Sequence, residues 1–297
     1  MTQQTAYIFG AGDAGIAAYN FLKAHYSVKG YIDNDAEKQA TKINGLNIYA
    51  SEKVLHFEFD YIFIASEFFE QIEQQLITKF GVAAQKVKVL PAHAIKVTKL
   101  GDTKTKQRAT QLLGLICRAL SLESIDYFVD AGTLLGIVRD DELIPWDDDL
   151  DIAIAHPHAK QCLNALNKLI PKLEQCFGVA WNIAENYAKS DYATIEENDI
   201  ASFKLRPLTN LEEFPQVDFF IKYINGNEMY HVISSRGFTF KSKHMFHRKN
   251  ITFKAHNLII PKEAESYLQD HYGDDWRTPK KEWHLGQISN ATVFKGE

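Results

Sequence analysis

The feature that most constrains this chain is a cluster of acidic residues at the start of an apolar segment, WDDDLDIAI, at positions 146–154. Four aspartates fall within five consecutive positions: Asp147, Asp148, Asp149 and Asp151. Repulsion and lost hydration make such a cluster costly beside apolar side chains unless cations compensate it. The segment therefore suggests a divalent-metal site for chemistry on phosphate.

A turn of small residues precedes this cluster. Residues 127–129, YFV, predict a strand that leads into a turn at Gly132-Thr133. Residues 134–138 then predict a short helix that carries Arg139. Backbone N–H groups of such a turn can hold phosphate oxygens while neighbouring acids hold metal. A small-residue turn followed by an acid-x-acid strand is similar to the core of nucleotidyltransferases related to DNA polymerase beta.

Strand geometry separates the aspartates. Alternation places Asp149 and Asp151 on one face, within reach of one cation, and points Asp148 away from them. Carboxylate oxygens suit Mg²⁺ (or Mn²⁺), which keeps waters and bridges substrate phosphates. A solvated acidic loop or helix caps at Asp147 and Asp148 would be the structural alternative.

A third strand would complete the site. Asp218 lies in an alternating segment, QVDFFI, and we predict it as a further carboxylate ligand. Lys204 and Arg206 share one face of another predicted strand. They either neutralise a substrate phosphate or pair at the surface with Glu212 and Glu213.

The string AGTLLGIVRDDELIPWDDDLDIAI closely resembles the signature of the LicD family, as do VDFF at 217–220 and the tail YGDDWRTP at 272–279. That family includes bacterial phosphocholine transferases and fukutin-type glycan phosphotransferases. Fifteen residues separate Thr133 from Asp149, slightly more than the plain polymerase-beta pattern has, and the LicD-like pattern contains the same loop. The resemblance spans roughly residues 108–282, and we expect Tyr272 and Trp276 to complete the core.

The resemblance implies a catalytic and metal-binding set and a substrate-binding set. The first is Asp147, Asp149, Asp151 and Asp218, and the second is Gly132, Thr133, Gly136 and Arg139, to which our reading of the strands adds Lys204 and Arg206. The implied reaction moves a substituted phosphate (phosphocholine or a polyol phosphate) from a CDP-linked donor to a hydroxyl of a cell-surface or lipid-linked glycan, releasing CMP. A nucleotidyltransferase that adds NMP to a small molecule or protein is one alternative, and a non-catalytic nucleotide-sugar-binding regulator is another.

The first part of the chain has a different pattern. A strand at 6–9 leads into G-x-G-x-x-G, with Gly10, Gly12 and Gly15, and then into a helix that runs to His25. Such glycines permit a tight turn, a close approach of the backbone to a ligand, and close helix–strand packing. Asp33 ends the second strand and could bond a ribose hydroxyl.

Further strands near 46–48, 61–65 and 87–90, with helices between them, predict a parallel, doubly wound sheet. Residues 5–91 resemble the small Rossmann-type domain of PglD-like bacterial sugar acetyltransferases. That resemblance implies a nucleotide or nucleotide-sugar pocket at Gly10, Gly12, Gly15 and Asp33. Two alternatives remain: glycines kept for packing alone, and a nicotinamide dehydrogenase, for which no hydride-transferring residues are evident.

We therefore predict an α/β Rossmann-like domain at 1–95 and an α+β domain of polymerase-beta nucleotidyltransferase type at 96–297. Within the second domain, helical periodicity marks 106–120, 159–177 (bent at Pro171) and 261–272. The acidic segment 185–199 predicts an exposed loop.

Charge and composition narrow the setting. The net charge of −5 argues against a nonspecific nucleic-acid binder. The basic segment 229–262 is either a solvated surface or a face for a phosphate-bearing ligand or an anionic membrane surface. An N-terminus that starts a strand at once, no apolar run of about 20 residues and three cysteines without a C-x-x-C pattern predict a cytoplasmic chain with no transmembrane segment, and peripheral membrane contact is compatible with it.

Overall fold

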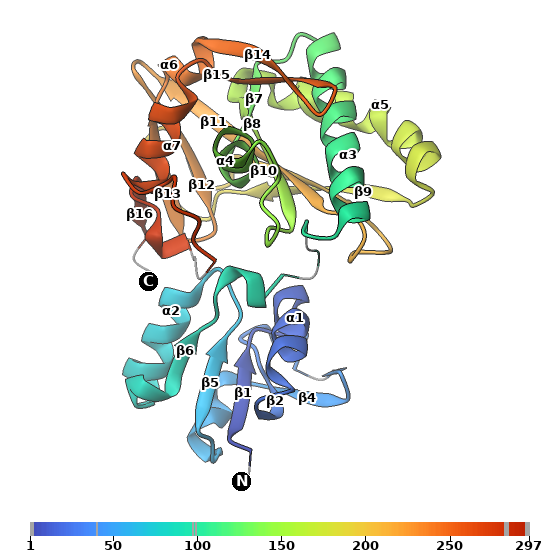
Figure 1. Cartoon of the computed structure of the whole chain (residues 1–297). Helices are drawn as coiled ribbons and strands as arrows, with labels where there is room; N and C mark the ends of the chain where they lie inside the picture. The colour runs from blue at the N-terminus through green and yellow to red at the C-terminus, as the bar shows by residue number, and fades with distance from the viewer. Residues whose placement is uncertain (1–2, 40, 97, 99, 282–284, 295–297) are drawn as a thin grey trace. The chain divides into compact units, whose positions relative to one another are not determined.

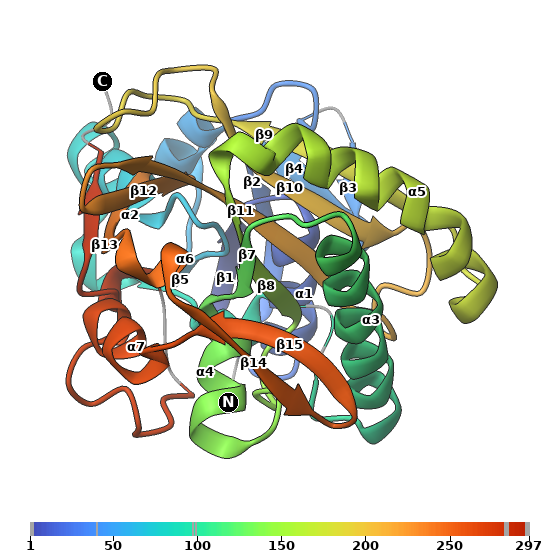
Figure 2. The ribbon, with the colours of Figure 1, turned by 90° about the horizontal axis from the view of Figure 1, so that it is seen from above.

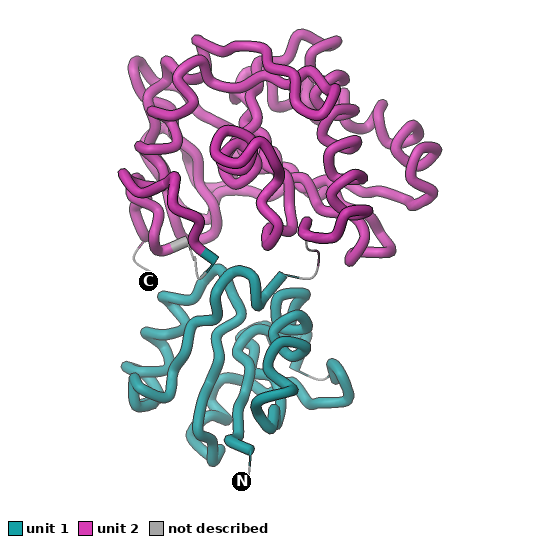
Figure 3. Tube along the Cα trace, in the orientation of Figure 1, with its two compact units in different colours: residues 1–97, 281–285, 296 teal, residues 98–280, 286–295, 297 magenta. Residues whose placement is uncertain are grey.

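The computed structural model describes residues 3–39, 41–96, 98, 100–281 and 285–294, which are drawn as a ribbon in Figure 1. The chain divides into two compact units, coloured separately in Figure 3. Unit 1 comprises Met1–Val97 with Lys281–Leu285, and unit 2 comprises Thr98–Lys280 with Gly286–Lys295. Among the described residues, no helix combines the length and apolar character that a membrane crossing requires.

Unit 1 is built on a six-stranded sheet in the order β3-β4-β2-β1-β5-β6. Its strands are β1 (Thr5–Phe9), β2 (Ser27–Ile32), β3 (Lys42–Ile43), β4 (Leu46–Tyr49), β5 (Tyr61–Ile64) and β6 (Val87–Val89). Every pair is parallel except β3 with β4. The predicted parallel sheet of Rossmann-like type is confirmed.

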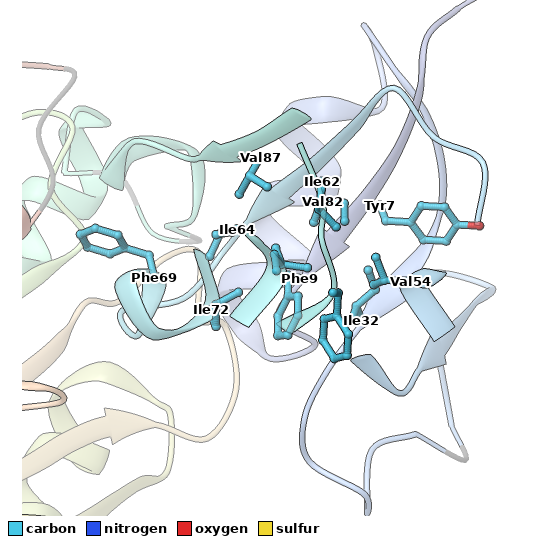
Figure 4. Packing of buried hydrophobic residues seen from close by; sticks show 12 residues of the cluster. Tyr7, Phe9, Ile32, Val54, Ile62, Ile64, Phe69, Ile72, Val82 and Val87 are labelled. Atoms are coloured by element: carbon cyan, nitrogen blue, oxygen red, sulfur yellow. The ribbon is translucent and has the colours of Figure 1, made fainter. Parts of the chain in front are cut away.

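Alternation along β1 supplies two separate cores. Ala6 and Ile8 belong to a cluster with Leu22 of α1 (Asp13–Leu22). Phe9 belongs to a second cluster with Ile72 of α2 (Phe69–Gln74), part of which is shown in Figure 4. Because successive strand residues point to opposite faces, a strand buried on both sides needs apolar residues at every position.

The helices of unit 1 differ from our prediction. Between β2 and β4 the described residues contain no helix, and the short strand β3 pairs with β4 instead. The connection from β4 to β5 contains a 3-10 helix, Ser51–His56. Helix α1 ends at Leu22, three residues before His25. The remaining turns are the π-helical Gln75–Lys79 and the 3-10 segments Ala84–Lys86 and Ala92–Ala94.

Unit 2 contains a larger sheet in the order β16-β13-β12-β11-β10-β9, with β8 also paired to β11 and β7 paired to β8. The strands are β7 (Tyr127–Val129), β8 (Asp149–Ala155), β9 (Trp181–Tyr187), β10 (Ile200–Pro207), β11 (Gln216–Asn225), β12 (Glu228–Ile233), β13 (Arg236–Lys241) and β16 (Ala291–Val293). Strands β8 and β11 are parallel, although 60 residues separate the end of one from the start of the other.

Helices cover this sheet at both ends. They are α3 (Thr103–Leu122), α4 (Ala131–Asp140), α5 (Ala159–Phe177), α6 (Lys243–Phe246) and α7 (Ala264–Tyr272), with short 3-10 segments at His156–His158 and Leu285–Gln287. Figures 1 and 2 show α3 and α5 near β9, and α7 near β13. A separate hairpin, β14 (Arg248–Phe253) with β15 (His256–Pro261), packs on α3 and β7.

Several predicted boundaries in unit 2 shift. Strand β9 continues to Tyr187, so the first part of the predicted acidic loop is strand. Pro261 ends β15, where it pairs with Arg248, and α7 begins only at Ala264. Helix α5 continues through Pro171. Of the three cysteines, Cys117 and Cys162 are buried, whereas Cys176 is exposed.

Replacing Gly15 with alanine should destabilise unit 1 by about 2 kcal/mol or more. The added Cβ would lie 2.1 Å from the carbonyl oxygen of Gly10, a backbone atom. Elsewhere in a helix interior the same change stabilises by up to about 1 kcal/mol, so the sign here is reversed.

The matched control is Gly12→Ala, whose Cβ would meet nothing within 4 Å. It should unfold within about 0.5 kcal/mol of the unmodified protein. Urea unfolding followed by circular dichroism measures both variants, and equal stability of Gly15→Ala and the unmodified protein would contradict the packing role.

Candidate functional site

The parallel pairing of β8 with β11 brings the predicted acids together. Asp151 is the register partner of Asp218, and Asp149 is the partner of Gln216. On the other side of β11, Lys204 of β10 is the register partner of Asp218. Directly paired residues point to the same face of a sheet. The structure therefore places Asp149, Asp151, Asp218 and Lys204 on one face.

Three aspartates at the start of β8 lie close enough to share a cation. Asp147, Asp148 and Asp149 each offer an oxygen, and these oxygens lie within 4.8 Å of one another. Among the described residues, this is the one group of three or more histidine, cysteine or acidic side chains that meets this distance. It differs from the predicted metal set because it contains Asp148 and omits Asp151 and Asp218.

The prediction that Asp148 points away from its neighbours was wrong. Strand β8 begins at Asp149, so Asp148 lies in the preceding turn. Alternation applies only within a strand. In that turn the N–H of Asp148 donates to the carboxylate of Asp147 at 3.3 Å.

Asp151 is buried against the first turn of α4. Its side-chain oxygen Oδ2 accepts a hydrogen bond from the N–H of Thr133 at 3.1 Å, and its own N–H donates to Thr133 Oγ1 at 2.8 Å. A Cβ on Gly132 would lie 2.5 Å from Asp147 Oδ2 and 3.3 Å from Asp151 Oδ2. Glycine at 132 therefore lets the helix approach both carboxylates.

The surroundings of Asp151 disfavour its negative charge. Burial, followed by the charges of Asp147, Asp218 and Asp130, raises the pKa of Asp151 well above its usual range. The hydrogen bond from Thr133 acts in the opposite direction but is outweighed. A cation beside these oxygens would favour the ionised form again.

The predicted small-residue turn is the first turn of a longer helix. Helix α4 begins at Ala131, and Asp130 caps it by accepting the Ala131 N–H at 2.7 Å. Ala131 has φ of +39°, in the left-handed region. An L-residue pays roughly 1–2 kcal/mol to adopt that conformation. The backbone at the start of α4 is therefore strained.

Two predicted substrate-binding residues lie further along α4. A Cβ on Gly136 would lie 2.5 Å from the carbonyl oxygen of Glu142, so packing of the following loop accounts for this glycine. Arg139 lies in the last turn, about 12 Å along the axis from Ala131 at 1.5 Å per residue, and its guanidinium binds Asp140 through Nε and NH2 at 2.7–3.0 Å. A substrate role for either residue stays a prediction.

The two predicted strand cations have different environments. Lys204 Nζ lies 3.4 Å from Asp218 Oδ2, so it compensates a carboxylate of the site itself. Arg206 is exposed, two residues further along the same face of β10. The alternative partner Glu213 instead pairs with Arg108.

Four residues near the site were not predicted to belong to it. Asp130 and Lys222 are buried and form an ion pair of 2.8 Å, while the hydroxyl of Tyr267 donates to Asp130 at 2.5 Å. Tyr272 was assigned to the core. Burial and the charges of nearby aspartates, the largest being that of Asp151, raise the pKa of Tyr272 well above its usual range, so its phenol lies in the field of the acids.

One signal in the sequence pointed to this group. Lys222 interrupts an otherwise apolar strand, VDFFIKYI, and a lysine inside such a strand needs a buried anionic partner.

In unit 1 the predicted nucleotide-binding residues meet at one turn. Gly10 has φ of +116° and approaches Ala65, and Gly15 packs on Gly10, so both are required by the fold. Gly12 has open space on its Cβ side. The carboxylate of Asp33 accepts the N–H of Ala11 at 2.8 Å, which holds the acid against the turn.

The basic segment is largely neutralised by carboxylates of the same unit. Arg248 pairs with Asp126, Lys254 with Asp141 and Glu142, and Lys243 with Glu263. These contacts favour a structural role for those cations. They give no support to a membrane-facing surface.

Comparison with known proteins finds a separate family match in each of the two units. Residues 124–263 match the family model described as LicD/FKTN/FKRP, nucleotidyltransferase domain, and residues 2–88 match the one described as C2185-like, N-terminal. The match at residues 124–263 includes strands β8 and β11, which carry the acids, so this part of the mixed α/β protein is a domain of a known class. Residues 124–263 therefore form a domain of the LicD family, and the first domain is C2185-like.

Curated relatives match parts of the chain. Ribitol-5-phosphate transferase FKTN of Homo sapiens is 22% identical over 181 residues, which are 60% of this chain and 35% of that protein. A Rickettsia prowazekii protein described as uncharacterized is 39% identical over 71 residues, 24% of this chain and 25% of that protein. The chain therefore spans about a third or less of the length of these relatives.

Among solved structures, UDP-D-quinovosamine 4-dehydrogenase from Vibrio fischeri has a TM-score of 0.26 and 22% identity, covering 30% of this chain and 80% of that one. GenD2 from gentamicin A biosynthesis, in complex with NAD, has a TM-score of 0.26 and 11% identity, covering 89% and 81%.

Replacing Asp151 with asparagine should raise the melting temperature of the metal-free protein by about 2 °C or more at pH 7. The folded state raises the pKa of Asp151. Its ionisation therefore removes stability as the pH rises from the unfolded pKa of about 3.9 toward the higher folded value. Asparagine can still accept from Thr133 and carries no charge.

The gain should accordingly shrink as the pH falls toward 4. Glu212→Gln, which removes an exposed carboxylate, is the control and should leave the melting temperature unchanged. Calorimetry of the two variants in chelator-containing buffer provides the measurement. A lower melting temperature for Asp151→Asn at pH 7 would contradict the repulsion described here.

Proposed function

We propose that this chain is a metal-dependent phosphotransferase that moves a substituted phosphate, phosphocholine or a polyol phosphate, from a CDP-linked donor to a hydroxyl of a cell-surface glycan or its lipid-linked precursor, releasing CMP. Membership of the LicD family supports transfer of a phosphate group, and the relative named ribitol-5-phosphate transferase FKTN supports a polyol phosphate as the transferred group. The observation that carries the proposal is a group of carboxylates near the starts of two parallel strands. Oxygens of Asp147, Asp148 and Asp149 lie within 4.8 Å of one another, and Asp151 is the register partner of Asp218.

The oxygen-only donor set fits a hard divalent ion such as Mg²⁺ or Mn²⁺. Asp147, Asp148 and Asp149 would hold it through oxygens that already lie within 4.8 Å of one another. Asp151 lies against Gly132 together with Asp147. When bound, the ion supplies charge neutralisation for the pyrophosphate and lowers the pKa of an attacking hydroxyl. It would also favour ionised Asp151, whose charge burial and neighbouring acids oppose.

The protein's own residues would arrange the donor and acceptor. Thr133 keeps Asp151 in place through two hydrogen bonds. Gly132 leaves room between α4 and the acids. Arg206 offers an exposed guanidinium on the same sheet face for a phosphate or glycan group.

For the C2185-like domain we propose a nucleotide or nucleotide-sugar site at the turn formed by Gly10, Gly12 and Gly15, next to Asp33. Packing explains the first and third glycines, whereas Gly12 has neither a close neighbour nor a positive φ. A ligand phosphate approaching the backbone there is a reason for a residue without a side chain.

The catalytic proposal is tested with the full chain, Mg²⁺ and a panel of CDP-ribitol, CDP-glycerol and CDP-choline, following CMP release. Asp149→Asn and Asp151→Asn should each lower turnover by about 100-fold or more, as expected when a group that fixes a catalytic metal is lost. Glu212→Gln should retain full turnover.

Near-normal turnover in both aspartate variants would overturn the assignment. The mass of the acceptor product separates the related alternative, because a nucleotidyltransferase would leave NMP on the acceptor. Metal-independent binding of a nucleotide sugar without turnover would favour a regulatory protein.

Gly12→Ala separates a ligand role from packing in the first domain. It should weaken binding of a CDP- or UDP-linked sugar by about 10-fold, since a methyl group would occupy the space at the phosphate, while stability is retained. Titration calorimetry measures this, and undiminished binding to Gly12→Ala would contradict a site at this turn.

A further inference from the structure

Strain and buried charge meet at the start of α4. Ala131 holds a φ of +39°. A strained residue persists only where its surroundings determine its conformation. The residue before it, Asp130, is the group that contacts Ala131 directly, through the bond from the Ala131 N–H at 2.7 Å.

Asp130 is itself held from two other elements. Lys222 Nζ of β11 lies 2.8 Å from Asp130 Oδ2, and the Tyr267 hydroxyl of α7 donates to Asp130 Oδ1 at 2.5 Å. Asp130 also connects to β8, because its N–H donates to the carbonyl oxygen of Asp151 at 2.9 Å. All four ties converge on one buried side chain and its backbone.

Lys222 is fixed in turn by its own surroundings. Its side chain is fully buried, lies 4.5 Å from the centroid of the Phe240 ring, and is 2.9 Å from His231 Nδ1. Burial and the charge of Lys222 hold the pKa of His231 well below its usual range, so the neutral ring accepts a hydrogen bond from the ammonium. Lys222 thus has little freedom to leave Asp130.

We propose that Asp130 and Lys222 are a positioning pair for the carboxylate site: with Tyr267 they hold Ala131 in its left-handed conformation and so keep Gly132 and Thr133 against Asp147 and Asp151. Neither member of the pair touches the substrate. Their effect on turnover rests on the proposed function, whereas their effect on the shape of the first turn of α4 does not.

The test compares Asp130→Leu, which removes the oxygen that accepts from Ala131 and Tyr267, with Lys222→Met and the double variant Asp130→Leu/Lys222→Met. Each single change should lower stability, because it leaves the other charge buried and uncompensated. The double variant should recover much of that stability without regaining the ion pair. A merely structural role predicts that function recovers with it, and a positioning role predicts that it does not.

Rescue gives the sharper discrimination. Adding Ala131→Gly to Asp130→Leu removes the opposition to a positive φ, so the first turn should return to its place. The matched control is Ala255→Gly, which relieves a φ of +69° in the turn of β14 and β15. Both glycines relieve strain, but only the one at 131 acts on the turn that meets the acids.

Two readouts are taken on the full chain. Mn²⁺ affinity, by calorimetry, should fall about 10- to 100-fold in both single variants and in the double variant. It should be restored by Ala131→Gly and not by Ala255→Gly. Hydrogen exchange of the peptide that contains residues 131–138 should rise at least 10-fold in the same variants and be restored in the same way.

A failure of the positioning proposal can be distinguished from a failure of the proposed metal-dependent function. If the unmodified protein bound no Mn²⁺, the metal-dependent function would fail while the exchange measurement still decided the role of the pair. Unchanged exchange in Asp130→Leu and Lys222→Met would overturn the positioning proposal. Equal rescue by the two glycines would do the same, since it would reduce the effect to global stability.

Discussion

Buried negative charge determines how unit 2 is arranged. Asp130, Asp151 and Asp218 are all buried, and each needs compensation within the fold because water cannot reach it. Lys222 compensates Asp130 and Lys204 compensates Asp218. Asp151 receives a hydrogen bond from the neutral Thr133 N–H, which lowers its pKa, but burial and the charges of Asp147, Asp218 and Asp130 outweigh that bond and raise the pKa. Of these three acids, Asp151 is therefore the one whose negative charge its surroundings disfavour most.

Compensation also explains why residues distant in sequence had to meet. Lys222 lies on β11 and Asp130 directly follows β7, and β8 lies between these two strands. The same arrangement makes Asp151 the neighbour of Asp218. Because the buried cation and the buried acids depend on one strand order, a rearrangement of the sheet would leave several charges uncompensated at once. That dependence favours a single topology.

Local patterns in the sequence predicted what depends on local geometry. Alternation correctly predicted that Asp149 and Asp151 lie on one face. The strands and helices that begin with the G-x-G-x-x-G motif correctly predicted a parallel sheet. The boundaries were less predictable because partners distant in sequence decide them. Pro261 belongs to β15 because it pairs with Arg248 of β14. Asp148 does not follow the alternation because β8 starts one residue later. The tie from Tyr267 to Asp130 spans 137 residues and has no local signature.

The strain at Ala131 shows what the buried pair contributes beyond stability. A buried ion pair is commonly no more stabilising than apolar residues of the same size, so its retention calls for another reason. An apolar pair at these positions could fill the volume, but it could not accept the N–H of Ala131 or the hydroxyl of Tyr267. A carboxylate at 130 offers Oδ1 to both donors and, at the same time, Oδ2 to Lys222. The charge of Asp130 is thus needed at the start of α4. There the backbone conformation of Ala131, rather than packing, sets the distance between α4 and the carboxylates.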